Sequence, residues 1–121
     1  MTNVDIPEAL RARMNRPRPP AIDEVREFLL CHVADVEDLE ELRVDIARTA
    51  RLNKNTVLRD ADAIETLLAS PQPPGTLSWM VAAHGNWVLD DEASDAEAAE
   101  WLRGLATLIR DVVRGLDENP V

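Results

Sequence analysis

The chain has 121 residues and a formal net charge of −10 at pH 7, with 45% hydrophobic residues. This length fits one domain, and regularly spaced apolar residues exclude a disordered acidic tail. No apolar run approaches the ~20 residues that cross a bilayer, so we expect no membrane span. The sequence shows no apolar secretory core, and Cys31 has no second cysteine to pair with. We therefore expect a cytoplasmic protein.

The acidic residues are unevenly distributed along the chain. Residues 1–20 carry a net charge of +2, residues 21–44 carry −6, residues 45–70 are neutral and residues 71–121 carry −6. An acidic surface repels phosphate backbones and anionic lipids and favours basic partners. The alternative interpretation is that the charge only keeps the protein in solution.

Helical spacing dominates the first half of the chain. The pattern predicts a short helix over residues 5–14, which a proline-rich connector ends before residue 21. A second helix is predicted over residues 22–33 and a third over residues 36–50. The apolar positions of the third are Leu39, Leu42, Ile46, Ala47 and Ala50.

The second half predicts two long helices around one ambiguous segment. Asn53 or Asn55 can cap a helix whose apolar positions run from Val57 to Leu68. Residues 77–89 fit either a helix, which the pattern favours, or a hairpin. Ser94 and Glu97 have the spacing of a capping box and begin the last helix, for which Gly115 is a plausible stop.

These elements predict an all-α fold, a small single-domain bundle of about five helices. Residues 1–20 would form the short N-terminal helix and connector, and residues 21–116 the helical core.

Catalytic chemistry has little support in the sequence. The histidines are His32 and His84, and His32 follows Cys31 on a helix, where neighbours point about 100° apart. We expect His84 to cap backbone groups in a turn. The run of acids at residues 90–92 lacks the spacing of a calcium loop, and no glycine-rich phosphate loop is present. We expect no enzyme activity, no cofactor and no bound metal.

The neutral centre contains a possible DNA-binding motif. Asp45–Arg59 resembles the helix-turn-helix of repressors of the lactose-repressor type, with matches at Asp45, Ile46, Ala47, Ala50, Thr56, Val57 and Arg59. The resemblance implies that Lys54, Asn55 and Arg59 face the major groove. However, Arg51 stands where the turn glycine is usual, and acids flank the motif. A helix-turn-helix regulator is therefore the alternative function, and nucleic acid is not the partner we expect.

A second resemblance covers about half the chain, from residue 61 to residue 113. Residues 67–77, 85–91 and 98–102 resemble immunity proteins of contact-dependent-inhibition and related polymorphic toxin systems. This implies a non-enzyme that docks on a cognate toxin domain and neutralises it. The charge favours the same function, because toxin domains that act on nucleic acid tend to be basic.

The aromatic residues indicate where a partner would dock. Trp79 and Trp101 are predicted to lie in the core, whereas Trp87 precedes Asp90, Asp91 and Glu92. An apolar anchor beside an acidic rim is typical of a protein-binding hot spot, although Trp87 could instead plug one end of the bundle. A second acidic patch comprises Glu37, Asp38 and Glu41, and the sequence does not decide whether it joins the same face. The partner's identity and the oligomeric state are not predicted.

Overall fold

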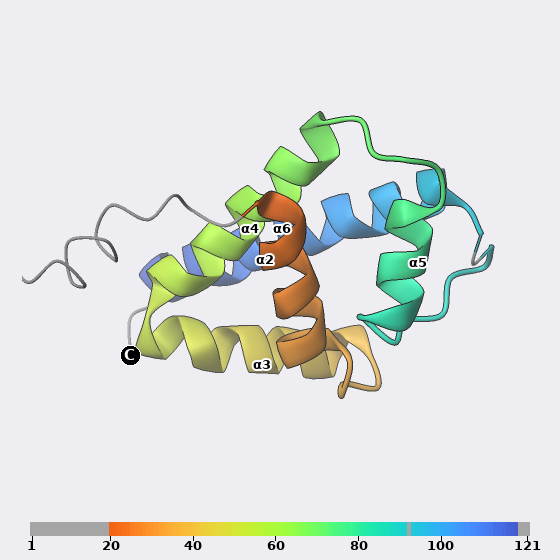
Figure 1. Cartoon of the computed structure of the whole chain (residues 1–121). Helices are drawn as coiled ribbons and strands as arrows, with labels where there is room; N and C mark the ends of the chain where they lie inside the picture. The colour runs from red at the N-terminus through yellow and green to blue at the C-terminus, as the bar shows by residue number, and fades with distance from the viewer. Residues whose placement is uncertain (1–19, 92, 119–121) are drawn as a thin grey trace, which may run out of the picture.

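The computed structural model describes residues 20–91 and 93–118, which form a helical bundle without strands in that part of the chain (Figure 1). The all-α prediction is thus confirmed. The predicted N-terminal helix and connector lie outside the described residues, except for Pro20. The elements are α2 (Ala21–Phe28), a π-helical segment η1 (Leu29–Val33), α3 (Leu39–Leu52), α4 (Lys54–Ala69), α5 (Thr76–Ala83) and α6 (Asp95–Glu118).

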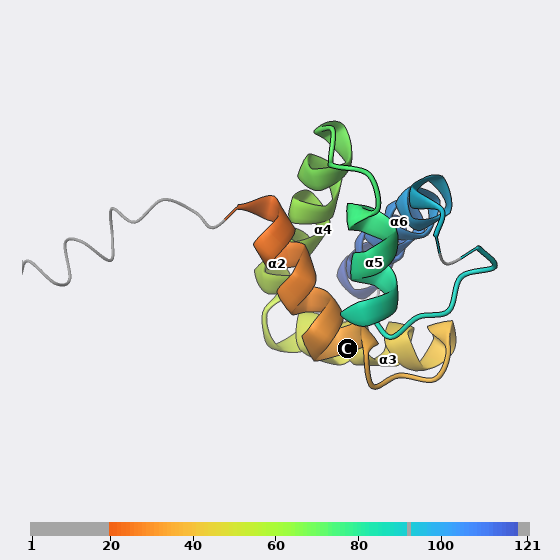
Figure 2. The same ribbon diagram turned by 45° about the vertical axis from the view of Figure 1, so that its right-hand side comes forward.

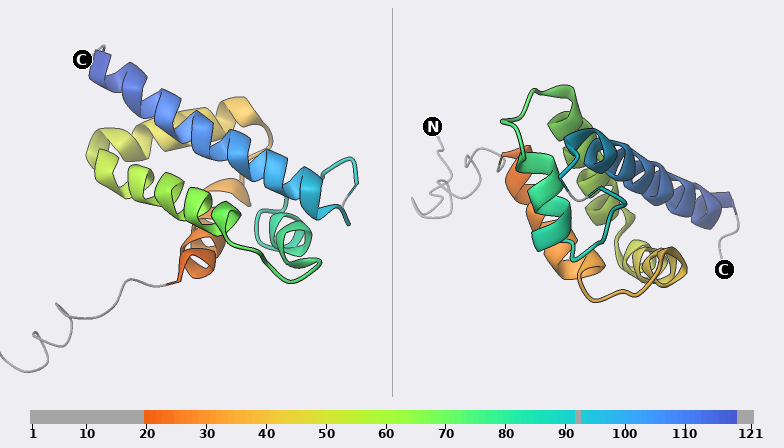
Figure 3. Two further views of the ribbon diagram at one scale, coloured as in Figure 1. Left: turned by 90° about the horizontal axis from the view of Figure 1, so that it is seen from above. Right: turned by 90° about the vertical axis from the view of Figure 1, so that its right-hand side faces the viewer.

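The core forms where α4 packs against α6, α2 and α3, and α5 packs against α6. The left view of Figure 3 shows α6 along its length with α4 beside it, and the views of Figures 1 and 2 place α5 near the start of α6. Apolar residues at helical spacing supply the interior. The fully buried large side chains are Val25, Leu29, Val33, Leu42, Ile46, Val57, Ile64, Met80, Val81, Leu102 and Ile109.

A one-residue junction joins α3 to α4. Asn53 has an extended backbone, and its side chain accepts a hydrogen bond from the Asn55 amide at 3.0 Å. This cap satisfies one of the amides that a helix start leaves without an intrahelical partner. The chain therefore turns sharply without a loop, and Asn53 is the capping residue of the two that the sequence offered.

Helix α5 begins at a left-handed glycine and is capped from another helix. Gly75 has φ of +85°, and the Asp95 carboxylate at the start of α6 accepts hydrogen bonds from the amides of Gly75 (2.6 Å) and Ser78 (3.0 Å). These two backbone bonds hold the pKa of Asp95 below its usual range. The contact ties the start of α5 to the start of α6 and settles residues 76–83 as helix. Residues 86–89 then run without regular structure, so no hairpin forms.

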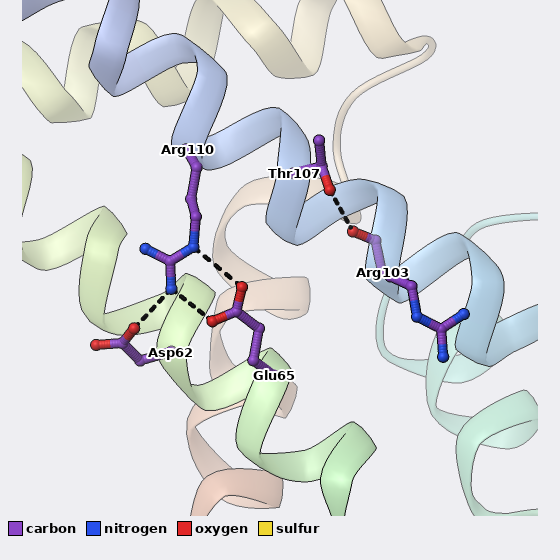
Figure 4. Close-up of polar contacts among 5 residues, drawn as sticks. All are labelled: Asp62, Glu65, Arg103, Thr107 and Arg110. Atoms are coloured by element: carbon purple, nitrogen blue, oxygen red, sulfur yellow. Dashed lines mark hydrogen bonds and ion pairs between the residues drawn. The ribbon is translucent and has the colours of Figure 1, made fainter.

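An ion-pair cluster links the outer surfaces of α4 and α6 (Figure 4). The Arg110 guanidinium donates to Asp62 at 2.7 Å and to both oxygens of Glu65 at 2.6 and 3.0 Å. Hydrogen bonding to Arg110 lowers the pKa of Glu65. The cluster is largely exposed, so we expect it to align the helices while contributing about 1 kcal/mol or less to stability.

Several sequence predictions about individual residues are wrong. Leu39 is 55% exposed and Trp79 is 60% exposed, so neither belongs to the core. The third helix begins at Leu39 rather than Val36 because Asp38 is its N-cap, accepting from the Glu41 amide at 2.8 Å. Gly115 does not end α6, which continues to Glu118.

Gly85 provides a test of this packing. A Cβ placed there would lie 2.8 Å from the Val81 carbonyl oxygen and in contact with Leu29, so Gly85→Ala should destabilise the fold by about 1–3 kcal/mol. Gly104→Ala is the control, because a Cβ there meets nothing within 4 Å, and alanine should stabilise the helix by about 0.5–1 kcal/mol. Urea unfolding measures both changes. Equal stability of the Gly85→Ala variant and the parent would contradict the described approach of residue 85 to α5.

Candidate partner-binding surface

The segment after α5 is extended and held at both sides. The Asn86 side chain donates to the Ala34 carbonyl at 3.3 Å, and the Trp87 amide donates to the Val81 carbonyl at 3.2 Å. Leu89 is buried, whereas Val88 is 78% exposed. Alternation of inward and outward side chains along the extended segment therefore presents Val88 to solvent.

Trp87 is half-buried and packs against Trp101 of α6, with ring centroids 5.4 Å apart. A cavity of about 290 Å³ beside it is lined by Val36, Glu37, Asn86, Trp87 and Val88. We call these five residues the tryptophan surface. The fold thus brings Glu37, the first residue of the second acidic patch, next to Trp87, a juxtaposition that the sequence left open.

Asp38 and Glu41, the other two residues of the second acidic patch, lie at the start of α3. Besides the Asp38 cap, the Glu41 carboxylate accepts from the amide of Glu37, one residue before the N-cap, at 2.7 Å. All three side chains remain exposed. Asp38 and Glu41 therefore fix the start of α3 and add exposed negative charge directly after Glu37, which lines the tryptophan surface.

The acidic loop before α6 is similarly held by hydrogen bonds from backbone amides to carboxylate side chains. Asp90 and Asp91 are exposed, the Asp91 amide donates to Glu97 at 2.6 Å, and the Asp91 carboxylate accepts from the Ala93 amide at 3.0 Å. The Ser94 hydroxyl caps α6 by accepting from the Glu97 amide at 3.1 Å, as the capping-box spacing predicted. Glu92, the third predicted acid, lies outside the described residues.

A second apolar surface, missed by the sequence analysis, lies between α3 and α6. A cavity of about 350 Å³, which we call the α3–α6 groove, is lined by Leu39, Arg43, Trp101, Gly104, Leu105, Thr107, Leu108 and Asp111. Trp101 packs against the core as predicted, but it is only partly buried, and its exposed part lines this groove. The signal was present in the sequence, since Trp101 beside Leu102 and Leu108 beside Ile109 make the apolar face of α6 unusually wide.

The structure around Lys54, Asn55 and Arg59 differs from the helix-turn-helix that the sequence resembles. Arg51 is helical rather than left-handed, and one residue replaces the usual turn of three or four. Asn55 is exposed, but Lys54 pairs with Asp117 at 3.3 Å and Arg59 pairs with Glu24 at 3.1 Å. Both cations are thus partly compensated by acids, which weakens their attraction for phosphate.

We predict no DNA binding at physiological salt, since paired cations on a protein of charge −10 cannot hold a phosphate backbone. A gel-shift titration with promoter DNA at increasing salt measures this. A salt-sensitive shift that is lost in Lys54→Ala and Arg59→Ala would instead establish the regulator function.

The histidines occupy two different environments. The His84 ring packs edge-on against Trp79, with ring centroids 4.7 Å apart, and its Nδ1 is buried without a hydrogen-bond partner. The prediction that His84 caps the turn is therefore wrong. Burial lowers its pKa, and the charge of Arg26 adds to that effect. His32 Nδ1 lies 2.7 Å from the Asp45 carboxylate, which orients the ring.

A third cavity, of about 310 Å³, lies between α2, η1 and α4. This acidic cleft is lined by Glu24, Glu27, Phe28, Cys31, His32, Thr56, Arg59 and Asp60. The pKa of Asp60 is raised to about 6, mainly by burial; the charges of Glu24 and Glu27 contribute to the rise, while His32 and Arg59 oppose it. Across residues 20–91 and 93–118, no three His, Cys, Asp or Glu side chains are grouped to hold a metal ion.

The raised pKa of Asp60 predicts a pH dependence of stability. The folded state binds this proton more tightly than the unfolded chain does. The contribution of Asp60 to stability should therefore decrease as the pH rises from about 4 to about 6. Asp60→Asn removes the buried charge and should stabilise the protein at pH 7 by about 1 kcal/mol, with no gain at pH 4. Urea unfolding at both pH values measures the difference.

Asp62→Asn is the matched control for this prediction, two residues along the same helix. It removes a partner of Arg110 and should not stabilise at pH 7. An Asp60→Asn variant no more stable than the parent at pH 7 would show that the carboxylate is solvated.

Comparison with protein-family models, curated proteins and solved structures found no significant match to this chain. Among the described helices, none has the length and apolar character required to cross a membrane.

Proposed function

We propose that the chain is a non-enzymatic binding protein that docks on a basic toxin domain and neutralises it. The observation that carries the proposal is the tryptophan surface, where Glu37 lies beside half-buried Trp87 and exposed Val88. An apolar anchor within an acidic rim supplies both parts of a binding site. The anchor becomes desolvated on docking, and the charges steer a basic partner to it.

The way the surface is held supports the proposal. Capping bonds and the Trp87–Trp101 contact fix both acidic segments before any partner arrives. A surface that needs little ordering on association keeps more of its contact energy as affinity. The resemblance of residues 67–77, 85–91 and 98–102 to immunity proteins of polymorphic toxin systems favours a toxin domain as the partner.

The test uses Glu37→Lys combined with Asp90→Lys, because neither side chain is a cap in the described hydrogen bonds. Asp91 is left unchanged, since its carboxylate holds the Ala93 amide. The proposal implies that a neighbouring gene encodes the toxin domain. We expect association with that domain to slow by about tenfold or more at low salt, with loss of protection in cells. Stopped-flow binding measures the rate, and a melting curve checks the fold.

The control is Glu27→Lys combined with Glu118→Lys, which changes the net charge equally but lies on α2 and at the far end of α6. Similar slowing in both double variants would mean that only total charge matters. Unchanged rates in both would remove the electrostatic basis of the proposal.

The apolar anchor is tested in the same assay. Val88→Ser alters a side chain that is 78% exposed, so stability should change by about 0.5 kcal/mol or less. Val88→Ser and Trp87→Ala should speed dissociation and leave association nearly unchanged.

A further inference from the structure

The α3–α6 groove is an apolar surface with helices on both sides. Trp101, Leu105 and Leu108 of α6 face Leu39 of α3 across it. Leu39 is 55% exposed at the first position of α3, so with partly buried Trp101 and Leu108 it forms a contiguous exposed apolar patch. The groove adjoins the tryptophan surface through the Trp87–Trp101 contact, so the apolar side chains of the two surfaces form one continuous strip.

Gly104 leaves the middle of this groove open. It sits inside a long helix, where glycine costs about 0.5–1 kcal/mol relative to alanine, and a Cβ there would meet nothing within 4 Å. The missing side chain exposes the backbone between Trp101 and Leu108. A partner chain can therefore approach α6 closely at this point.

The charge around the groove indicates what covers it. Residues 37–43 and 86–104 supply Leu39, Arg43, Trp101 and Gly104 to its lining, and the described residues of these segments include nine acids and two arginines. A second copy of a chain with net charge −10 would place like charges together around the groove. A partner segment with apolar residues on one side can pack them into the groove, and basic residues on its other side can interact with the surrounding acids.

We propose that the α3–α6 groove receives an amphipathic helix of the basic partner, with apolar side chains at i, i+3, i+4 and i+7 entering the groove and Lys or Arg at its margins. The inference rests on the proposed function, because it names the element of the partner that the strip recognises. Amphipathic helices that dock in apolar grooves insert side chains at this spacing. The groove's volume of about 350 Å³ is at the lower end of the range found for ligand-binding cavities.

Gly104→Trp tests the inference by filling the groove from the helix that lines it. Gly115→Trp is the matched control, since Gly115 is also an exposed glycine of α6 with nothing within 4 Å of a Cβ, and it does not line the groove. Two probes are used on the full chain. One is the neighbouring-gene toxin domain, and the other is a labelled designed peptide of about five helical turns with leucines on one face and lysines elsewhere.

We expect Gly104→Trp to weaken binding of both probes by about tenfold or more and Gly115→Trp to leave both within about twofold. Peptide binding should also weaken with added salt. Toxin-domain binding that is the same for Gly104→Trp and the parent, with melting curves unchanged, would overturn the groove inference while the proposed function stands.

Two further outcomes separate the hypotheses. If the parent binds the peptide but not the toxin domain, and Gly104→Trp abolishes peptide binding, the groove recognises basic helices and the proposed function is wrong. If sedimentation shows a dimer of the parent that Gly104→Trp dissociates, the occupant is a second copy of this chain and the inference is overturned.

Discussion

Helix α6 packs against α3, α4 and α5, and its apolar face is wider than these neighbours cover. Along one edge of the face, Ala98, Leu102 and Ile109 are buried, while Trp101 and Leu108 along the other edge stay partly exposed. One edge of the α6 face thus holds the bundle together, and the other edge remains as a partly exposed apolar strip. Because burial of apolar area is the main favourable contribution to folding and to association alike, a partner can extend the packing that the fold begins.

The helices could be predicted because their apolar spacing is set by local geometry. Val57, Ala61, Ile64 and Leu67 repeat at three or four residues, and all are buried along α4. Ser94 and Glu97 predicted a cap because capping is also a local interaction. Leu39 and Trp79 were misplaced because exposure depends on which helices pack nearby, and periodicity carries no information about neighbours.

The candidate surface was predictable only in part, for the same reason. Trp87 and the acids at residues 90–92 are close in sequence, so their association with one loop could be inferred directly. Glu37 and Trp87 come from distant segments that share a cavity and are joined by the hydrogen bond from Asn86 to Ala34, residues 52 positions apart. Gly104 gave no signal that it faces a groove, since a glycine within a helix is equally consistent with close helix packing.

Several carboxylates both cap backbone amides and carry exposed negative charge. They therefore link the stability of the fold to the charge of the surface. Asp38 and Glu41 begin α3, and Asp91 shapes the loop before α6, yet all three remain exposed to solvent. Backbone amides and the positive end of each helix partly offset the mutual repulsion of these acids. Concentrating negative charge in these segments therefore costs the bundle less stability, and the residual field remains available to a basic partner. Asp90 has no capping bond among the described residues, so its charge has the least structural compensation and contributes most directly to steering.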